Sequence, residues 1–206
     1  NIDRRSDPRL ILEGCQSIIA LAVNYQPHPE IDTEEKLTNS GEDFGKISSY
    51  AVHKDYHHTM KSMMKEYSRD LKKSISEDIR LRWYVDTGPV MEKAWAQRAG
   101  LGFIGKNTCL INRKKGSWFF LGVILTDLEL IYDQAVTQNW CGECSACIEA
   151  CPTNALDTAG VLDSNKCISY LTIEHREEVD IELKADFEGW LFGCDICQIV
   201  CPFNIK

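Results

Sequence analysis

The pattern of apolar and polar positions predicts a few well-separated strands and helices. Ser17 to Tyr25 is a continuous run of apolar and β-branched residues that ends before Pro27, which predicts a buried strand. The polar, acidic stretch at 27–45 predicts a loop. From Asp55, which suits an N-cap, apolar residues recur at steps of three and four. The stripe of this predicted helix consists of Met60, Met63, Met64, Tyr67, Leu71 and Ile75.

The next blocks complete an α+β pattern. Residues 81–85 predict a second strand, and Val90 to Ala99 predict a helix that Gly100 ends. Residues 108–112 and 117–126 predict an apolar hairpin across a turn at 113–116. We therefore expect an α+β, or α/β-like, domain over residues 1–135, followed by a cysteine-rich module over residues 136–206.

Eight of the ten cysteines lie in that module and follow a ferredoxin spacing. The first run, CxxCxxCxxxCP, consists of Cys141, Cys144, Cys147 and Cys151, and the second consists of Cys194, Cys197 and Cys201, with Cys167 in place of the missing first cysteine. In bacterial ferredoxins the last cysteine of each run ligates the other cluster. Two 4Fe-4S clusters would then be held by Cys141, Cys144, Cys147 and Cys201, and by Cys167, Cys194, Cys197 and Cys151. Zinc sites and disulfides are the alternatives, and neither accounts for the third close cysteine or the repeated Cys-Pro.

The net charge, the lack of long apolar runs and the first residue of the chain bear on the class of function. A net charge of −8 over 206 residues argues against a broadly basic nucleic-acid surface. Two local groups of cations, Lys106 with residues 113–115 and a series from Lys54 to Lys73, have the spacing of a solvated turn and a solvated helix face. No apolar run reaches the roughly 18 residues of a membrane span. The chain begins without methionine, so we expect a piece of a longer, cytoplasmic and monomeric gene product, since reduced thiols favour that compartment.

Other cofactor signals are weak. The glycines of GLGFIG match a dinucleotide fingerprint only loosely, without a preceding strand, and indicate a packing turn. Asp55-Tyr56-His57 opens like the corrinoid motif DxHxxG, but Met60 stands where the glycine belongs, so this segment is interpreted as a helix start. Cys15 and Cys109 are interpreted as small buried apolar residues.

Several motifs occur together in one order: VDTGPVMEKAWAQRAGLGFIGKNTCLI, GSWFFLGVILTDLEL, CGECSACIEACPTNAL, KCISYLTIE and GCDICQIVCPFN. From about Ser6 to Asn204 the chain closely resembles the epoxyqueuosine reductase family. The resemblance implies a cobalamin-binding catalytic domain joined to a ferredoxin-like domain with two 4Fe-4S clusters. It further implies reduction of the epoxide of epoxyqueuosine to queuosine in the tRNA anticodon loop, with tRNA and a flavodoxin- or ferredoxin-type electron donor as partners.

The resemblance also assigns residues. Asp86 takes the position of the proton donor, which suits the protonation of an alkoxide if burial beside the cofactor raises its pKa. The cobalamin-contacting positions are Arg5, Asp86, Lys106, Asn107, Thr108 and Ser169, together with the backbone of Cys194, Asp195, Ile196 and Cys197. Arg176 matches a position near the RNA. The alternatives for these residues are turn chemistry for Asp86 and ordinary surface hydrogen bonding for the others.

Two other functions remain open at this point. Reductive dehalogenases also combine a corrinoid with two ferredoxin clusters, although they usually carry an export signal. A pure electron-transfer module, in which the first domain only docks a partner, is the third interpretation. Stoichiometric uptake of a corrinoid separates this last class from the two enzymes.

Overall fold

The protein was studied as a computed structural model that describes residues 2–25, 45–52 and 54–205. The loop predicted at 27–45 lies outside these residues except for its last position. After α1 (Ile2–Ser6) and the short helix η1 (Pro8–Leu10), the first part of the chain is built on a three-stranded antiparallel sheet of order β1-β6-β3. The strands are β1 (Ser17–Asn24), β3 (Leu81–Tyr84) and the central β6 (Phe119–Thr126). The strands predicted near residues 17–25 and 81–85 are therefore confirmed.

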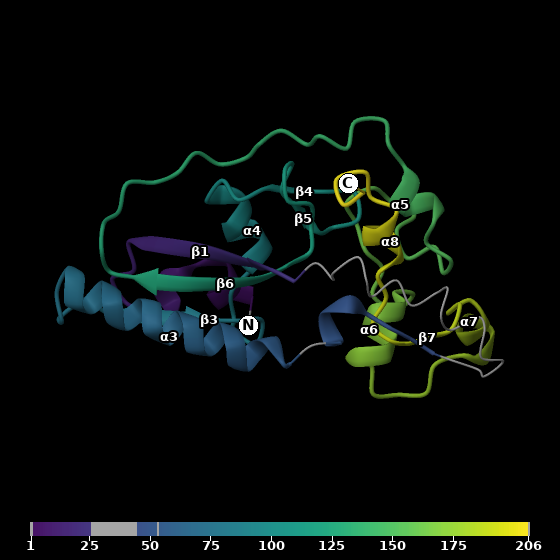
Figure 1. Ribbon diagram of the computed structural model, residues 1–206, viewed down its shortest axis with the longest axis horizontal. Coiled ribbons are helices and arrows are strands. Elements are labelled where there is room, and N and C mark those ends of the chain that lie inside the picture. Colours follow the sequence, from purple (N-terminus) through teal and green to yellow (C-terminus); the bar gives the residue numbers. More distant parts are fainter. Residues whose placement is uncertain (1, 26–44, 53, 206) are drawn as a thin grey trace.

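Two helices cover the two faces of this sheet (Figure 1). Side chains alternate along β6, so Ile124 packs with Met60 and Met64 of α3 (Tyr56–Ser74) on one face. Val123 and Leu125 point to the other face, where α4 (Glu92–Arg98) packs. Asp55 caps α3 by accepting a 2.8 Å hydrogen bond from the His57 N–H, as its N-cap position predicts.

The apolar stripe of α3 is narrower than its sequence spacing predicts. Met60, Met64 and Ser68 are buried, whereas Met63 and Tyr67 are 48% and 42% exposed, and Ile75 is 52% exposed. The helix lies on three short strands, so one row of residues spaced by four covers the sheet. Met63, which the sequence pattern favours as a core residue, is therefore exposed, and Tyr67 and Ile75 of the same stripe also lie outside the core.

The predicted hairpin between residues 108–112 and 117–126 is also wrong. The strand β5 (Leu110–Ile111) pairs with β4 (Phe103–Ile104), while β6 pairs with β1 on one side and β3 on the other. The turn itself exists, and an isolated antiparallel bridge between Asn112 and Gly116 closes it. A central strand has no free edge left for a hairpin partner, and this is why β5 turns to β4.

The cysteine-rich part consists of short helices joined by turns. Residues 127–139 lead to it without helix or strand, and α5 (Ala146–Glu149), α6 (Ile168–Ile173), α7 (Ile181–Ala185), β7 (Trp190–Phe192) and α8 (Ile196–Ile199) follow. Figure 1 shows these elements gathered at one end of the molecule, beside the tips of β4 and β5. No helix within the described ranges is long and apolar enough to span a membrane.

Contacts cross the boundary predicted near residue 135. The strand β2 (Lys46–Ile47) pairs in parallel with β7, and the helix η3 (Ser49–Ala51) follows it. Phe103 and Ile111 share an apolar cluster with Cys201 and Trp140. The two parts are thus interlocked in this structure, and the division into domains at residue 135 stays a prediction.

Candidate active site

The eight cysteines of the double motif occupy two neighbourhoods. All ten cysteines of the chain are free thiols. Burial raises the pKa of Cys147, and the charges of Cys141, Cys201 and Cys144 raise it further. Burial likewise raises the pKa of Cys194 to about 11, with further contributions from Cys167 and Cys151. These neighbours define a first thiol set, Cys141, Cys144, Cys147 and Cys201, and a second thiol set, Cys151, Cys167, Cys194 and Cys197.

The packing of two helices explains why each run contributes to both sets. Helices α5 and α8 lie against each other, and in each case a Cys-Pro pair follows one residue after the helix ends. Cys151 leaves α5 toward the second thiol set, and Cys201 leaves α8 toward the first. This matches the crossed arrangement that the ferredoxin spacing predicts. No three Cys, His, Asp or Glu side chains within the described ranges converge as a site for a single metal ion.

A backbone N–H group donates to one cysteine of each set. The N–H of Lys106 donates to Cys141 Sγ at 3.5 Å, and that of Ala155 donates to Cys151 Sγ at 3.3 Å. Such donors stabilise thiolates and the reduced state of an iron–sulfur cluster. A ninth thiol, Cys109, lies in hydrogen-bond contact with Cys197, and this contact together with burial raises the pKa of Cys197. The donor set, four thiols in each neighbourhood with N–H groups toward sulfur, fits two 4Fe-4S clusters.

A cavity of about 390 Å³ opens beside the second thiol set. Its lining includes all four cysteines of that set, Asn107, Thr108 and Cys109 from the loop between β4 and β5, and Ser169 and Ile196 from α6 and α8. Tyr50 and Lys93 from the first part of the chain complete one side. The cavity therefore joins the second thiol set to several residues that the family resemblance assigns to the cofactor.

The three residues of the KNT motif point in different directions. The Lys106 ammonium donates to the carbonyls of Gly142 at 2.7 Å and Cys144 at 3.0 Å, beside the first thiol set. The buried Asn107 amide donates to the Cys197 carbonyl at 3.1 Å. Thr108 lines the cavity at a φ of +62°, a left-handed conformation that costs energy for a side chain branched at Cβ. The side chains of Lys106 and Asn107 are thus occupied by the cysteine loops, and their predicted contacts with a corrinoid stay a prediction.

Asp86, like Thr108, has a strained backbone. Its φ is +59°, and the turn after β3 exposes 64% of its side chain. The Tyr56 hydroxyl donates to Asp86 Oδ2 at 3.0 Å, and His57 Nε2 lies 3.4 Å from the same oxygen. Burial raises the pKa of Tyr56, and the charge of Asp86 adds to this, so the phenol stays protonated and donates. The burial expected around Asp86 would have to come from bound cofactor and substrate.

Tyr50 connects this carboxylate with the cavity. Its ring lies 6.1 Å from that of Tyr56, and the charge of Asp86 contributes, after burial, to raising the pKa of Tyr50. Asp195, 2% exposed, accepts hydrogen bonds from the Ser48 hydroxyl and the Ser49 N–H and so fixes the segment that carries Tyr50. The side chain of Asp195 therefore anchors η3. Only the backbone of Asp195 is left for contact with a cofactor.

Sequence reasoning missed part of this constellation. Tyr56 and His57 were interpreted as a helix start, although the DxHxxG-like letters were the available signal. Glu92 was also missed: burial raises its pKa, and Asp86 and Arg5 act on it electrostatically. Arg5 and Arg176 are both exposed, and Arg5 lies on α1 near this end of α4. The assignments of Arg5 to the cofactor and of Arg176 to RNA stay predictions.

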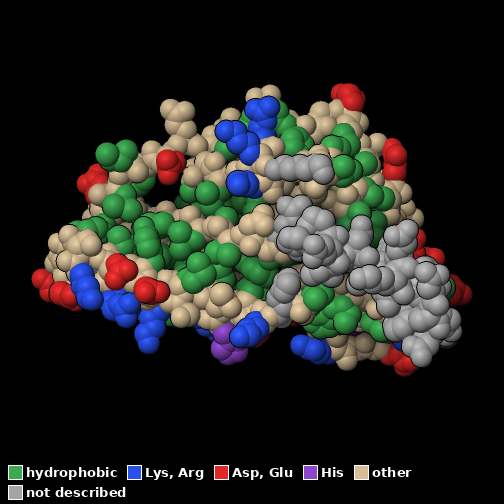
Figure 2. All heavy atoms as spheres, viewed as in Figure 1, with side chains coloured by type: hydrophobic (Ala, Val, Ile, Leu, Met, Phe, Trp, Pro, Cys, Tyr) green, Lys and Arg blue, Asp and Glu red, His purple; other side chains and the backbone are tan. Residues whose placement is uncertain are grey.

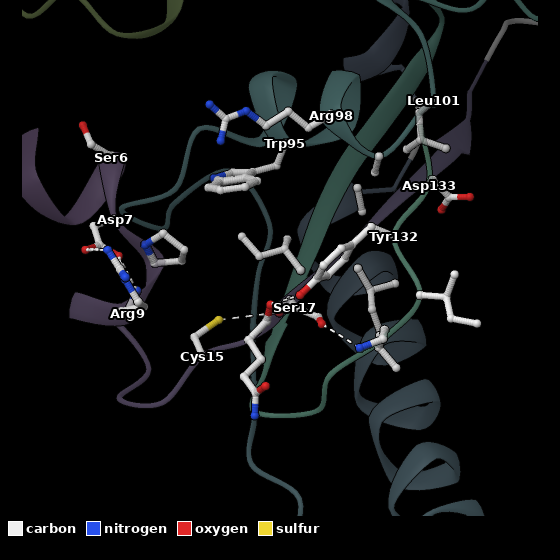
Figure 3. Close-up of a pocket in the computed structure, with 18 of the residues that line it drawn as sticks. Ser6, Asp7, Arg9, Cys15, Ser17, Trp95, Arg98, Leu101, Tyr132 and Asp133 are labelled. Carbon is white, nitrogen blue, oxygen red and sulfur yellow. Dashed lines mark hydrogen bonds and ion pairs between the residues drawn. The ribbon is translucent and has the colours of Figure 1, made fainter. Parts of the chain in front are cut away.

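The second and larger cavity contains no such constellation. It measures about 830 Å³ and lies between the start of β1, η1, α4 and residues 130–133. Figure 3 shows Trp95, Arg98 and Tyr132 around it, with the Cys15 thiol directed at the Ser17 carbonyl, 3.5 Å away. Cys15 packs partly buried against the core, in accord with the prediction of a small apolar residue. The candidate catalytic residues therefore lie at and beside the smaller cavity.

The fold and the two thiol sets define an iron–sulfur protein of the double-cluster class. Residues 140–204 match the family model of a 4Fe-4S double cluster binding domain. Residues 5–87, which contain Tyr56, His57 and Asp86, match the family model described as epoxyqueuosine reductase QueG, DUF1730.

Known proteins extend the match over the whole chain. The chain is 44% identical over 204 residues to an epoxyqueuosine reductase of Cyclobacterium marinum, covering 99% of this chain and 63% of that protein. It is 47% identical to one of Synechocystis sp., covering 98% and 67%. A crystal structure of epoxyqueuosine reductase with an epoxyqueuosine-modified tRNA-Tyr stem loop superposes with a TM-score of 0.88 at 32% identity, covering 100% and 53%. The chain belongs to the epoxyqueuosine reductase family, and it spans about two thirds of the length of these two relatives.

Proposed function

We propose that this chain is the catalytic and electron-transferring part of a cobalamin-dependent enzyme that reduces epoxyqueuosine to queuosine in the anticodon loop of tRNA. The observation that carries the proposal is the Asp86 carboxylate on its strained turn, which accepts a hydrogen bond from Tyr56. Tyr50 lies between this group and the cavity that the second thiol set lines. Family membership supports the same reaction, because the relatives are named for it.

The polar residues that line the cavity fit the edge of a corrinoid. A flat, amide-rimmed cofactor needs polar groups at its edge, and Thr108, Ser169 and the backbone around Ile196 supply them from three separate elements. The cavity is too small to enclose such a cofactor. When bound, cobalamin would supply a strongly reducing nucleophilic metal centre next to the second cluster. Arg5 would contact it from α1.

The chain's own residues manage the protons of this reaction. Conversion of an epoxide to an alkene consumes two electrons and two protons and releases water. Asp86, once protonated, gives a proton to the oxygen that leaves carbon. The Tyr56 hydroxyl holds the Asp86 carboxylate in position, and His57 links it to Asp55, whose Oδ1 lies 2.9 Å from His57 Nδ1. This series of groups provides a route by which Asp86 recovers its proton from solvent.

Clusters held by the two thiol sets would transfer the electrons. A 4Fe-4S cluster carries one electron at a time, so two clusters held by the two thiol sets would pass the two electrons on one after the other. The second thiol set borders the cavity and would deliver them, and the first lies farther from it and would receive them from an external donor. Arg176 would contact the tRNA, and the expected compartment is the cytoplasm.

Nucleoside mass spectrometry of tRNA tests the proposal. Deleting the gene is expected to replace queuosine by epoxyqueuosine, and complementation with Asp86→Asn is expected to leave the epoxide in place while wild type restores queuosine. Unchanged queuosine in the deletion strain would overturn the assigned substrate. A purified protein that carries both clusters but takes up no corrinoid would instead indicate an electron-transfer module.

A further inference from the structure

The turn Arg113-Lys114-Lys115, called here the basic turn, is a rigid group of exposed cations. Asn112 and Gly116 exchange two backbone hydrogen bonds of 2.8 Å that close it. The Asn112 side chain accepts from the N–H groups of Lys114 and Lys115 at 3.0 and 3.1 Å. The three charges are therefore held together by the backbone, as in an Asx turn.

The basic turn lies against the peptides that carry two cysteines of the first thiol set. The Arg113 guanidinium lies 4.8 Å above the ring of Trp140, which directly precedes Cys141. On the other side, the Ser117 N–H donates to Asn204 Oδ1 at 2.7 Å. The Asn204 N–H in turn donates to the Cys201 carbonyl at 2.8 Å.

The approach between the turn and the Cys201 segment is close. A Cβ on Gly116 would meet Asn204 Oδ1 at 2.1 Å, so only glycine allows it, and its φ is +75°. The turn is thus fixed to both ends of the first thiol set.

The first thiol set is also the accessible one. Cys144 is the exposed member among the eight cysteines, and the second thiol set borders the inner cavity. The Lys106 ammonium on the Gly142 and Cys144 carbonyls adds a further positive charge here. The acids on the same cysteine loop are Glu143 and Glu149, and Glu149 accepts a hydrogen bond from Ser145. Cations therefore predominate beside the exposed cluster of a chain whose net charge is −8.

We propose that the basic turn is the docking surface for an acidic, low-potential electron-transfer protein that reduces the cluster of the first thiol set. The inference rests on the proposed function, because it requires that cluster. In each encounter the donor's flavin or iron–sulfur centre would lose one electron, and a 4Fe-4S cluster held by the first thiol set would take it up, from the 2+ to the 1+ state, without bond or proton transfer. Opposite charges steer such short-lived complexes, whose interfaces are typically below about 1,200 Å².

The other cationic surface of the chain is a suitable contrast. Along α3, Lys61, Lys65 and Lys73 are exposed, but Arg69 lies within 3.5 Å of Glu66 and 3.9 Å of Asp70. Figure 2 shows this row of Lys and Arg side chains along the edge of the molecule with acidic side chains beside it. Figure 1 shows that α3 covers the sheet, whereas the cysteine-rich helices lie at the other end of the molecule. A donor docked on α3 would be remote from the first thiol set.

The test measures how fast an acidic donor reduces the cluster-loaded protein. Photoreduced flavodoxin is mixed anaerobically with wild type, with the double variant Arg113→Glu/Lys115→Glu and with the α3 control Lys65→Glu/Lys73→Glu, which changes the net charge equally. At low ionic strength the second-order rate of cluster bleaching is expected to fall at least about 10-fold in the first variant only. The difference is expected to shrink as salt screens the charges. Reduction by reduced methyl viologen, a small cation, is expected to persist in all three proteins.

Two results would overturn the proposal: a wild-type rate with flavodoxin in the double variant, or an equal loss in the α3 control. If reduction is unchanged in the double variant and a separate binding measurement shows weaker binding of an anticodon stem loop, the basic turn is an RNA surface instead. The assay contains neither cobalamin nor tRNA. A negative docking result with both clusters intact therefore leaves the proposed function standing, whereas failure to load the clusters counts against that function.

Discussion

Replacing Asp195 by asparagine is expected to loosen the contact between the cysteine loop and residues 46–52. The Asp195 carboxylate is buried, accepts the Ser49 N–H at 2.7 Å and also accepts the Ser48 hydroxyl. These two hydrogen bonds hold η3, and with it Tyr50, beside the cavity and the Asp86 carboxylate. The contact joins residues far apart in sequence, so its loss is expected to loosen both the segment at 46–52 and the loop that carries Asp195.

The magnitude follows from the number of acceptors. An asparagine side chain offers one acceptor oxygen. When that oxygen keeps the Ser49 N–H, the NH₂ group donates to the Ser48 oxygen, and the Ser48 hydroxyl proton loses its acceptor. Leaving a buried donor unsatisfied costs about 1 to 3 kcal/mol. Because about 1.4 kcal/mol corresponds to a factor of ten, amides that open with this contact are expected to exchange hydrogen about 5- to 150-fold faster.

Hydrogen exchange followed by mass spectrometry on the cluster-loaded protein measures this local opening. Peptides covering 46–52 are expected to lose protection, while those covering β6 keep it and serve as the internal reference. Ser48→Ala in the Asp195→Asn background is the matched control, because it also removes the hydroxyl proton that has lost its acceptor, so the double variant loses less than the sum of the single changes. Unchanged protection at 46–52 in Asp195→Asn, or strictly additive losses, would refute the reasoning.

Four further changes test other parts of the structure. Tyr56→Phe keeps the ring stacked on Phe120, whose centroid is 4.2 Å away, but removes the hydroxyl that donates to Asp86. Single-turnover rates are expected to fall about 10-fold, which corresponds to one hydrogen bond to a charged group of about 1.5 kcal/mol. An unchanged rate would show that Tyr56 has no role at the site. Cys147→Ala is expected to lower the iron content from about eight to about four per chain, and retention of all the iron would contradict the thiol sets. Burial raises the pKa of Glu92 above its usual 4.5, so the folded state binds this proton more tightly and loses stability as pH rises from 4.5 through the raised value. The gain in melting temperature of Glu92→Gln over wild type should therefore be larger at pH 8 than at pH 4, and the opposite trend would show the sign to be wrong. Met64→Ala, at a position with 0% exposure, is expected to lose about 2 to 5 kcal/mol in denaturant unfolding, whereas Met63→Ala, 48% exposed, should lose less than about 0.5 kcal/mol.

The sequence pattern predicted a strand and a helix start that depend on neighbouring residues. Ser17 to Tyr25 forms a strand, and Asp55 caps α3, because these features depend on neighbouring residues. The spacing of the cysteines likewise predicts two groups of four thiols, and the structure brings members of the same groups together. Their role as cluster ligands stays a prediction.

Contacts between distant segments were beyond the sequence pattern. Nothing local indicates that Leu110 and Ile111 pair with β4 because β6 is occupied on both edges. The hydrogen bond from Tyr56 to Asp86 joins the start of α3 to the turn after β3 and depends on how α3 lies across the sheet. The positive φ of Asp86 could be suspected from its D-T-G-P turn, but its partners could not.

The KNT loop acts as a fixed spacer between the two redox neighbourhoods. Lys106 binds carbonyls of the loop that carries Cys144, and Asn107 binds the carbonyl of Cys197, so two consecutive side chains join the first and second thiol sets. With both side chains held in this way, the chain turns at Thr108 through a left-handed conformation, and this strain is the cost of the arrangement. Electron transfer depends steeply on separation. A loop that fixes both thiol sets to one rigid segment therefore keeps the distance between the two sets constant.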